Sequence, residues 1–122
     1  MFEPRDLTIV SAVRVGGGDT CGAALRSELL QLHLASIERI NRIFGIKHVL
    51  VDWGSDPPVR GSWIPCILDR VEVEAWGESR AKNRGLESVG TPLVAFTSAD
   101  VVFTENTVLM TMKAIREANP FI

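Results

Sequence analysis

Two kinds of apolar pattern divide the first half of this chain. Residues 7–13, LTIVSAV, form a β-branched run with few charges, which predicts a strand covered on both faces. From residue 21 or 22 to Phe44, apolar side chains recur at helical spacing, and Gly45 stands where a helix would end. We therefore predict a strand and then one long amphipathic helix. Its apolar positions are Leu30, Leu34, Ile37, Ile40 or Asn41, and Phe44.

A second strand is predicted by the short apolar run from Val49 to Val51, which ends at Asp52 and a Gly-Ser turn. The succession of strand, helix and strand is typical of parallel sheets, because parallel neighbours need a long crossover and a helix supplies it. Residues 57–65 hold the prolines and the glycine of a loop. Residues 66–75, CILDRVEVEA, predict a third strand near a sheet edge, because its charges need solvent.

The second half of the chain predicts a helix, a strand and a further helix. Residues 78–88 contain strong helix formers and end before a Gly-Thr-Pro stop signal. Residues 93–100, LVAFTSAD, predict a buried, central strand that ends by presenting Asp100. Thr104 can then cap a last helix that has Glu105 in its first turn. The apolar face of this helix is predicted to hold Val108, Met112 and Ile115, with Leu109 alongside.

The order β, α, β, β, α, β, α predicts one α/β domain over residues 1–122, with helices flanking a mostly parallel sheet. A composition of 46% apolar and 23% charged residues suits a single globular domain. The net charge is only -2 and the basic residues are dispersed, so we expect no nucleic-acid partner. The N-terminus does not read as a secretory signal, and no apolar run approaches the roughly 20 residues of a membrane span. We therefore expect a cytoplasmic protein without a transmembrane segment.

The cysteines and histidines point to no chemistry. Cys21 and Cys66 have neither CxxC spacing nor a neighbouring His at metal spacing, so we expect two free thiols in a reducing cytoplasm. We expect His33 on a helix surface and His48 just before a strand, and we assign a function to neither.

Ligands of parallel α/β sheets bind at the carboxyl ends of the strands, which brings residues 12–14, 52–56 and 98–100 to one rim. A carboxylate there can accept hydrogen bonds from a base or a ribose, or ligate Mg²⁺, which takes one or two carboxylates and fills its other positions with phosphates and waters. Arg80, on the helix before the last strand, can counter phosphate charge. The structural alternative is that the aspartates are turn residues and that the cations of this helix form a solvated face.

The glycine loop that follows the first strand offers no established phosphate motif. Neither G-x-G-x-x-G nor G-x-x-x-x-G-K-[ST] can be written through residues 15–22, which argues against a dinucleotide site or a P-loop. We expect this loop to lie over the site.

Three stretches, by their order and separation, resemble the nucleotide-sugar-binding half of the family 2-like GT-A glycosyltransferases. They are LTIVSAV, then VLVDWGSD, then ESRAKNRGLESVGTPLVAFTSADVVFTENTVLMTMKAI. In that family a first strand precedes an Asp-x-Gly-Ser turn, an Ala-x-Asn-x-Gly helix and an apolar strand ending in Asp-x-Asp. The resemblance covers nearly the whole chain. It implies a Rossmann-like GT-A sandwich that binds a nucleoside-diphosphate sugar, for hexosyl transfer to a saccharide, lipid or protein acceptor.

Residue by residue, the resemblance implies a nucleotide site beside a metal site. Ala12 and Val13, at the end of the first strand, would border the nucleotide, and Asp52 would hydrogen-bond its base. Arg80 would lie near the diphosphate. Asp100 matches the last acid of Asp-x-Asp and would hold the Mg²⁺ or Mn²⁺ ion that bridges the two phosphates.

Two departures from the family pattern alter these expectations. Ser98 stands where the family has its first acid; it can hydrogen-bond a ribose but adds no charge, so metal binding should be weaker or dispensable. The family also continues beyond the last helix with the half that supplies the acceptor site and the catalytic base. The chain thus resembles a donor-binding half truncated at its C-terminus, with no assigned catalytic residue, whose open side a second copy or a partner chain would cover. The alternative is a non-catalytic nucleotide-sugar-binding module or an interaction module.

Overall fold

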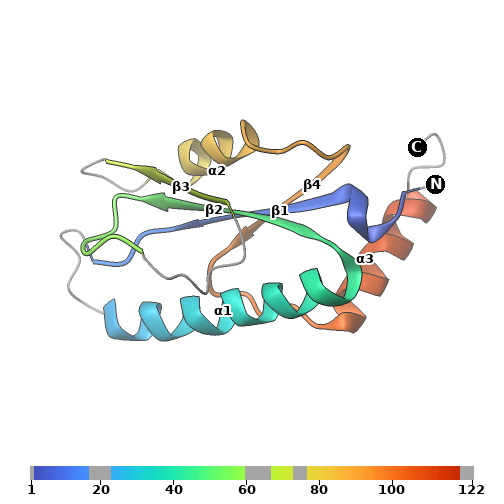
Figure 1. Ribbon diagram of the computed structural model, residues 1–122, viewed down its shortest axis with the longest axis horizontal. Helices are drawn as coiled ribbons and strands as arrows, with labels where there is room; N and C mark the ends of the chain where they lie inside the picture. The colour runs from blue at the N-terminus through green and yellow to red at the C-terminus, as the bar shows by residue number, and fades with distance from the viewer. Residues whose placement is uncertain (1, 17–22, 60–66, 73–76, 119–122) are drawn as a thin grey trace.

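One parallel sheet with helices on both faces forms the part of the chain that the computed structural model describes, residues 2–16, 23–59, 67–72 and 77–118 (Figure 1). Among these residues, no helix has the combination of length and apolar character that a membrane crossing requires. The elements in chain order are the 3-10 helix η1 (Pro4–Asp6), β1 (Leu7–Val13), α1 (Ala23–Phe44), β2 (Lys47–Trp53), β3 (Ile67–Val71), α2 (Glu78–Leu86), β4 (Leu93–Ser98) and α3 (Glu105–Ala118).

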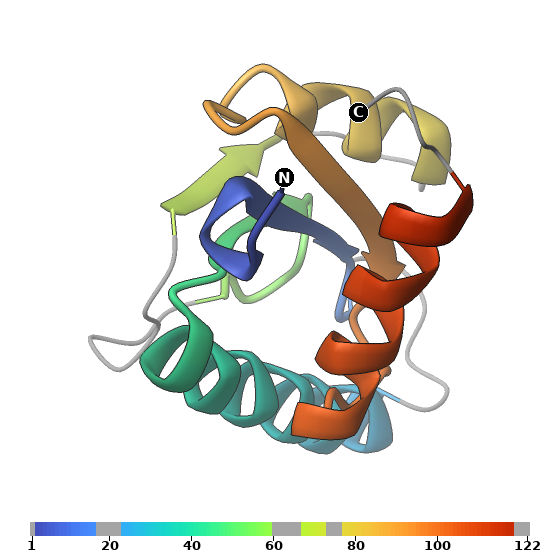
Figure 2. The same cartoon turned by 90° about the vertical axis from the view of Figure 1, so that its right-hand side faces the viewer.

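The sheet has the strand order β3-β2-β1-β4, and every neighbouring pair is parallel. The α/β class and the parallel sheet are therefore confirmed, and among the described strands β3 lies at a sheet edge as predicted. Figure 2 shows how the helices are distributed: α2 covers one face of the sheet, while α1 and α3 lie on the other side.

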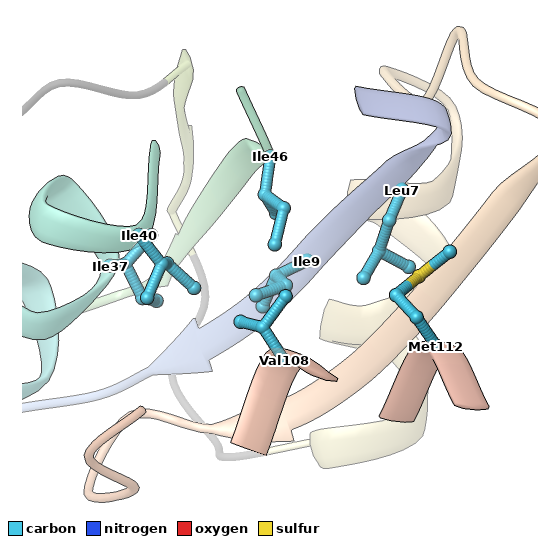
Figure 3. Close-up of a cluster of buried hydrophobic side chains, with 7 residues drawn as sticks. All are labelled: Leu7, Ile9, Ile37, Ile40, Ile46, Val108 and Met112. Atoms are coloured by element: carbon cyan, nitrogen blue, oxygen red, sulfur yellow. The ribbon is translucent and has the colours of Figure 1, made fainter. Parts of the chain in front are cut away.

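All seven residues of β1 are buried, because the strand is paired on both sides and covered on both faces. Since successive side chains of a strand point to opposite faces, β1 contributes to two cores. Val10 packs with Val51 and with Ala81 of α2. On the opposite face, Ile9 belongs to a cluster with side chains from α1 and α3, drawn in Figure 3. Its buried members are Leu7, Ile9, Ile37, Ile40, Ile46, Val108 and Met112.

The position of β4 corrects one expectation. We expected a buried, central strand, but within the described part of the chain β4 lies at the sheet edge and pairs with β1 alone. Its side chains alternate between half-buried and exposed, with Val94 36% and Phe96 44% exposed. The physical reason is that α2 lies over β1 and β2, so the α2 side of β4 is left uncovered.

The helix ends follow the predicted signals. The Gly45 N–H donates to the Asn41 carbonyl and closes α1, and the Thr104 Oγ1 accepts a hydrogen bond from the Thr107 N–H at the start of α3. Val108 and Met112 are buried as predicted, whereas Leu109 is 57% exposed.

Helix α2 packs on the sheet through its smallest residues. A Cβ atom added to Gly85 would lie 2.5 Å from Val10 Cγ1 and 2.8 Å from Val51 Cγ2, which is closer than real contacts allow. The glycine of the Ala-x-Asn-x-Gly stretch thus lets the helix approach β1 and β2 and fixes where its first turn, with Arg80, lies.

Candidate functional site

The predicted rim exists as a continuous edge of the sheet. Because β2, β1 and β4 are adjacent and parallel, their carboxyl ends lie together (Figure 1). Val13 lies directly beside Asp52, and Ala12 lies directly beside Ser98. Four of the six residues named from the sequence are therefore direct neighbours across the strand pairs.

These four side chains divide between the two faces of the sheet. Ala12 packs in the cluster that includes Ala81 of α2, and Ser98 shares its face because the two residues are paired. Val13 packs instead with Leu30 and Leu34 of α1. Asp52, paired with Val13, also faces the α1 side. Of these four residues only Ser98 is exposed, and it lies on the α2 side of the sheet, on β4.

Asp52 is fully buried, and both of its oxygens have protein partners. Oδ1 accepts from the Ser55 N–H at 3.0 Å, while Oδ2 accepts from the Val59 N–H at 2.9 Å and from Arg70 Nη1 at 2.6 Å. The carboxylate thereby organises the Gly-Ser turn and anchors Val59. A nucleotide base would have to displace one of these donors to reach it, so the base contact implied by the resemblance stays a prediction.

The loops after β1 and β2 are fastened to each other. The Val15 N–H donates to Ser55 Oγ at 2.9 Å, and the Asp56 N–H donates to the Val15 carbonyl at 3.0 Å. Gly16 has φ +76°, and a Cβ added to it would lie 2.2 Å from the Asp56 carbonyl oxygen. A glycine is needed at this position. The loops after β1 and β2 are therefore in close contact and form one connected unit at the rim.

Among the cations of α2, only Arg80 lacks an ion-pair partner within the described residues. Lys82 pairs with Glu78 at 2.9 Å and Arg84 with Asp69 at 2.8 Å, so two of the three positive charges already have acidic partners. A Cβ added to Gly77 would lie 3.6 Å from carbons of the Arg80 side chain and 3.7 Å from Trp53 Nε1. Arg80 therefore lies near the end of β2, at the rim.

Asp100 is exposed in the turn that follows β4, where the Val101 N–H approaches the Ser98 carbonyl at 3.4 Å. Within the described ranges no group of three or more His, Cys, Asp or Glu side chains is arranged to hold a metal. An exposed single carboxylate nevertheless fits Mg²⁺ or Mn²⁺ delivered with a diphosphate, because phosphates and waters supply the remaining oxygens.

A buried polar cluster lies below the rim, and both of its histidines correct our expectations. His33 is fully buried rather than on the helix surface, and His48 is buried within β2 rather than ahead of it. Their Nε2 atoms both lie 2.7 Å from Ser11 Oγ. A signal for His33 existed: it lies three residues after Leu30 and four before Ile37, on the apolar stripe of α1.

The hydrogen bonds of this cluster determine which ring nitrogens of the two histidines carry a proton. His33 Nδ1 is bonded to the Val101 carbonyl, which can only accept, so Nδ1 carries the proton and Nε2 must accept from the Ser11 hydroxyl. The Ser11 oxygen is then free to accept from His48 Nε2–H. His48 Nδ1, for which the described residues provide no partner, is by this assignment a lone pair and not an N–H group.

Burial lowers the pKa of both histidines. Desolvation, together with a smaller contribution from the neighbouring His33, lowers the pKa of His48 to about 3. Desolvation also lowers the pKa of His33, although its hydrogen bond to Val101 and the charge of Asp100 oppose this shift. Both rings are neutral in the folded protein near pH 7.

Two sequence-based expectations lie outside the described residues: the free thiols of Cys21 and Cys66, and the covering role of the glycine loop beyond residue 16.

Comparison of the chain with protein-family models, with curated proteins and with solved structures finds no match.

The buried histidines predict a stability that decreases in mild acid. A group whose folded pKa lies below its unfolded value of 6.5 takes up a proton on unfolding, so the free energy of unfolding falls as pH drops from about 6.5 towards 3. The slope is about 1.4 kcal/mol per pH unit for each such proton. Urea unfolding at pH 7, 6 and 5, above the range in which most carboxylates titrate, measures this slope.

The variant His48→Gln removes one titrating group while its amide can still donate to Ser11. Its slope between pH 6 and 5 should be smaller than that of the wild type by up to about 1.4 kcal/mol per pH unit. Lys47→Gln, at the exposed neighbouring position, should leave the slope unchanged. Equal slopes for the wild type and His48→Gln would contradict the assignment of a buried, neutral His48.

Proposed function

We propose that the chain binds a nucleoside-diphosphate sugar at the rim of β2, β1 and β4, with Mg²⁺ or Mn²⁺ at Asp100, as the donor-binding part of a glycosyltransferase-like protein. One observation carries the proposal: the exposed carboxylate of Asp100 follows β4, and the guanidinium of Arg80, which has no ion-pair partner among the described residues, lies near the end of β2 at the same edge of the sheet. The sequence resemblance to the family 2-like GT-A glycosyltransferases supplies the ligand class.

Three exposed polar residues named from the sequence, Arg80, Ser98 and Asp100, have distinct roles in this proposal. Asp100 would provide one oxygen ligand to the metal, and Arg80 would donate to phosphate oxygens with its planar fork. Ser98 would hydrogen-bond a ribose hydroxyl. The bound ion would stabilise negative charge on the departing nucleoside diphosphate as a Lewis acid.

The remaining predicted residues lie at the ends of β1 and β2, next to the proposed nucleotide site. Ala12 and Val13 end the central strand and would border the nucleotide. The contacts of Asp52 favour an indirect role, in which it holds the turn beside the base instead of bonding the base itself. No described residue is assigned as the general base of a transfer reaction, so the proposal for this chain is donor binding.

The second candidate is an interaction module that retains the fold. The observation in its favour is the edge strand β4, whose exposed side chains include Val94 and Phe96. The two candidates differ in what they require of Asp100 and Arg80, because only donor binding needs their charges.

Thermal and urea unfolding with UDP, GDP and dTDP, each with and without Mn²⁺, tests donor binding. A nucleotide present at 100 times its dissociation constant should stabilise the fold by about 2.7 kcal/mol. Asp100→Asn should remove only the increment due to Mn²⁺, whereas Arg80→Gln should weaken the nucleotide effect with and without metal. The controls Glu117→Gln and Lys113→Gln change the same charges on α3. If no nucleotide stabilises the wild type, donor binding is excluded and the interaction module becomes the better reading.

Restoring the missing first acid provides an independent prediction. Ser98 is exposed, and Ser98→Asp recreates the Asp-x-Asp spacing with Asp100. A second carboxylate should strengthen Mn²⁺ binding in the presence of the nucleotide roughly tenfold, as measured by calorimetric titration. Asn106→Asp adds the same charge on α3 and should leave the affinity unchanged. Equal Mn²⁺ affinity in the wild type and Ser98→Asp would argue against a metal at this turn.

A further inference from the structure

The segment that carries Asp100 is hydrogen-bonded to helix α1. His33 Nδ1–H donates to the Val101 carbonyl, and the Phe103 N–H donates to Ser36 Oγ at 3.0 Å. The Ser36 hydroxyl donates in turn to the His33 carbonyl at 2.7 Å. Two backbone groups within three residues of Asp100 are thus fixed by one turn of α1.

The side chains on either side of Asp100 support the same attachment. Ala99 packs against the cluster that contains Leu30 and Leu34 of α1. Phe103 packs against the core between α1 and α3, and its ring centroid lies 6.1 Å from that of His33. Asp100 itself remains exposed between these two anchored positions.

The orientation of the His33 ring is fixed from its other side. Ser11 Oγ–H donates to His33 Nε2 while accepting from His48 Nε2–H, so the proton of His33 is kept on Nδ1. This is the tautomer that the bond to Val101 requires. A chain of hydrogen bonds therefore runs from β2, through β1 and α1, to the backbone beside Asp100.

We propose that His33, together with Ser36, is a positioning residue that holds the Asp100 carboxylate in the direction that binds the metal, with Ser11 and His48 selecting the tautomer. The metal part of this proposal rests on the proposed function. Groups that orient a ligand through hydrogen bonds commonly change metal affinity by 10- to 100-fold when removed, which sets the expected size of the effect.

The attachment itself can be tested without any ligand. In Ser36→Ala the Phe103 amide loses its acceptor and should exchange with solvent about fivefold faster than in the wild type. Ser27→Ala, the same change on the same helix, should leave this rate unaltered. The ¹⁵N resonances of the His33 ring should report a neutral Nδ1–H tautomer in the wild type and lose that pattern in Ser11→Ala. An unchanged Phe103 rate or an Nε2–H tautomer in the wild type would overturn the attachment.

The positioning role is tested by the Mn²⁺ dissociation constant, measured by electron paramagnetic resonance with Mn²⁺ alone and with UDP, GDP and dTDP in turn. Ser36→Ala and His33→Leu should weaken Mn²⁺ binding about tenfold or more. His33→Asn, whose side-chain amide can replace the Nδ1–H donor, should restore the affinity to within about threefold of the wild type.

The outcomes separate the two proposals. Mn²⁺ binding to the wild type that is unchanged in Ser36→Ala and His33→Leu would overturn the positioning role and leave donor binding intact. The absence of Mn²⁺ binding to the wild type with every nucleotide would overturn the metal site and the positioning role with it. Equal loss in His33→Leu and His33→Asn would overturn the hydrogen bond to Val101 as the positioning contact.

Discussion

The pairing of β1 with parallel neighbours on both sides is the constraint on which the rest of the structure depends. Because β1 is buried along its whole length, its register with β2 and β4 determines which side chains face α1 and which face α2. A shift of one residue would turn Ser11 away from the two histidines and would move Ala12 to the opposite face. The same register brings the ends of three strands, and the loops that follow them, to one rim.

Polar groups inside this core connect it to the rim. Ser11 in β1 and Asp52 in β2 are each fully buried, with hydrogen-bond partners from distant parts of the chain. Burial of such groups is tolerated because their bonds are satisfied. Asp52 organises the loops after β1 and β2, and the Ser11 cluster reaches the turn after β4. The exposed residues Arg80 and Asp100 thus lie beside loops and a turn whose backbone is held in place by these hydrogen bonds.

Periodicity and end signals were sufficient to predict most of the fold. The helical repeat before Gly45, the crossover logic of strand, helix, strand and the Thr104 cap each depend on local physics, and the corresponding elements are present. The rim could be predicted because neighbouring parallel strands have their carboxyl ends at the same edge of the sheet. The prediction that β4 is a central strand was wrong, because the residue pattern of a strand does not show which strands it pairs with. An apolar run in an edge strand has the same pattern as one in a central strand.

The details of the site were less accessible because they depend on contacts between residues far apart in sequence. The partner of Asp52 is Arg70, whose guanidinium is brought to it by the pairing of β2 with β3. His33 was predictable from its place on the apolar stripe of α1, but its bonds to Ser11 and Val101 were not. Lys82 pairs with Glu78 one turn earlier in the same helix, a pair that the sequence itself indicates, whereas the Arg84 partner Asp69 is brought to it by the fold.

The central claim is that the exposed part of the rim holds a metal-bound diphosphate. Paramagnetic broadening by Mn²⁺ in the amide spectrum of the nucleotide-bound protein tests this most directly, because it locates the ion without a variant. The account predicts the strongest broadening at residues 98–101, with further broadening around Arg80 and at the end of β1. Strongest broadening at another acidic position, such as Glu105 or Glu117 on α3, would contradict it.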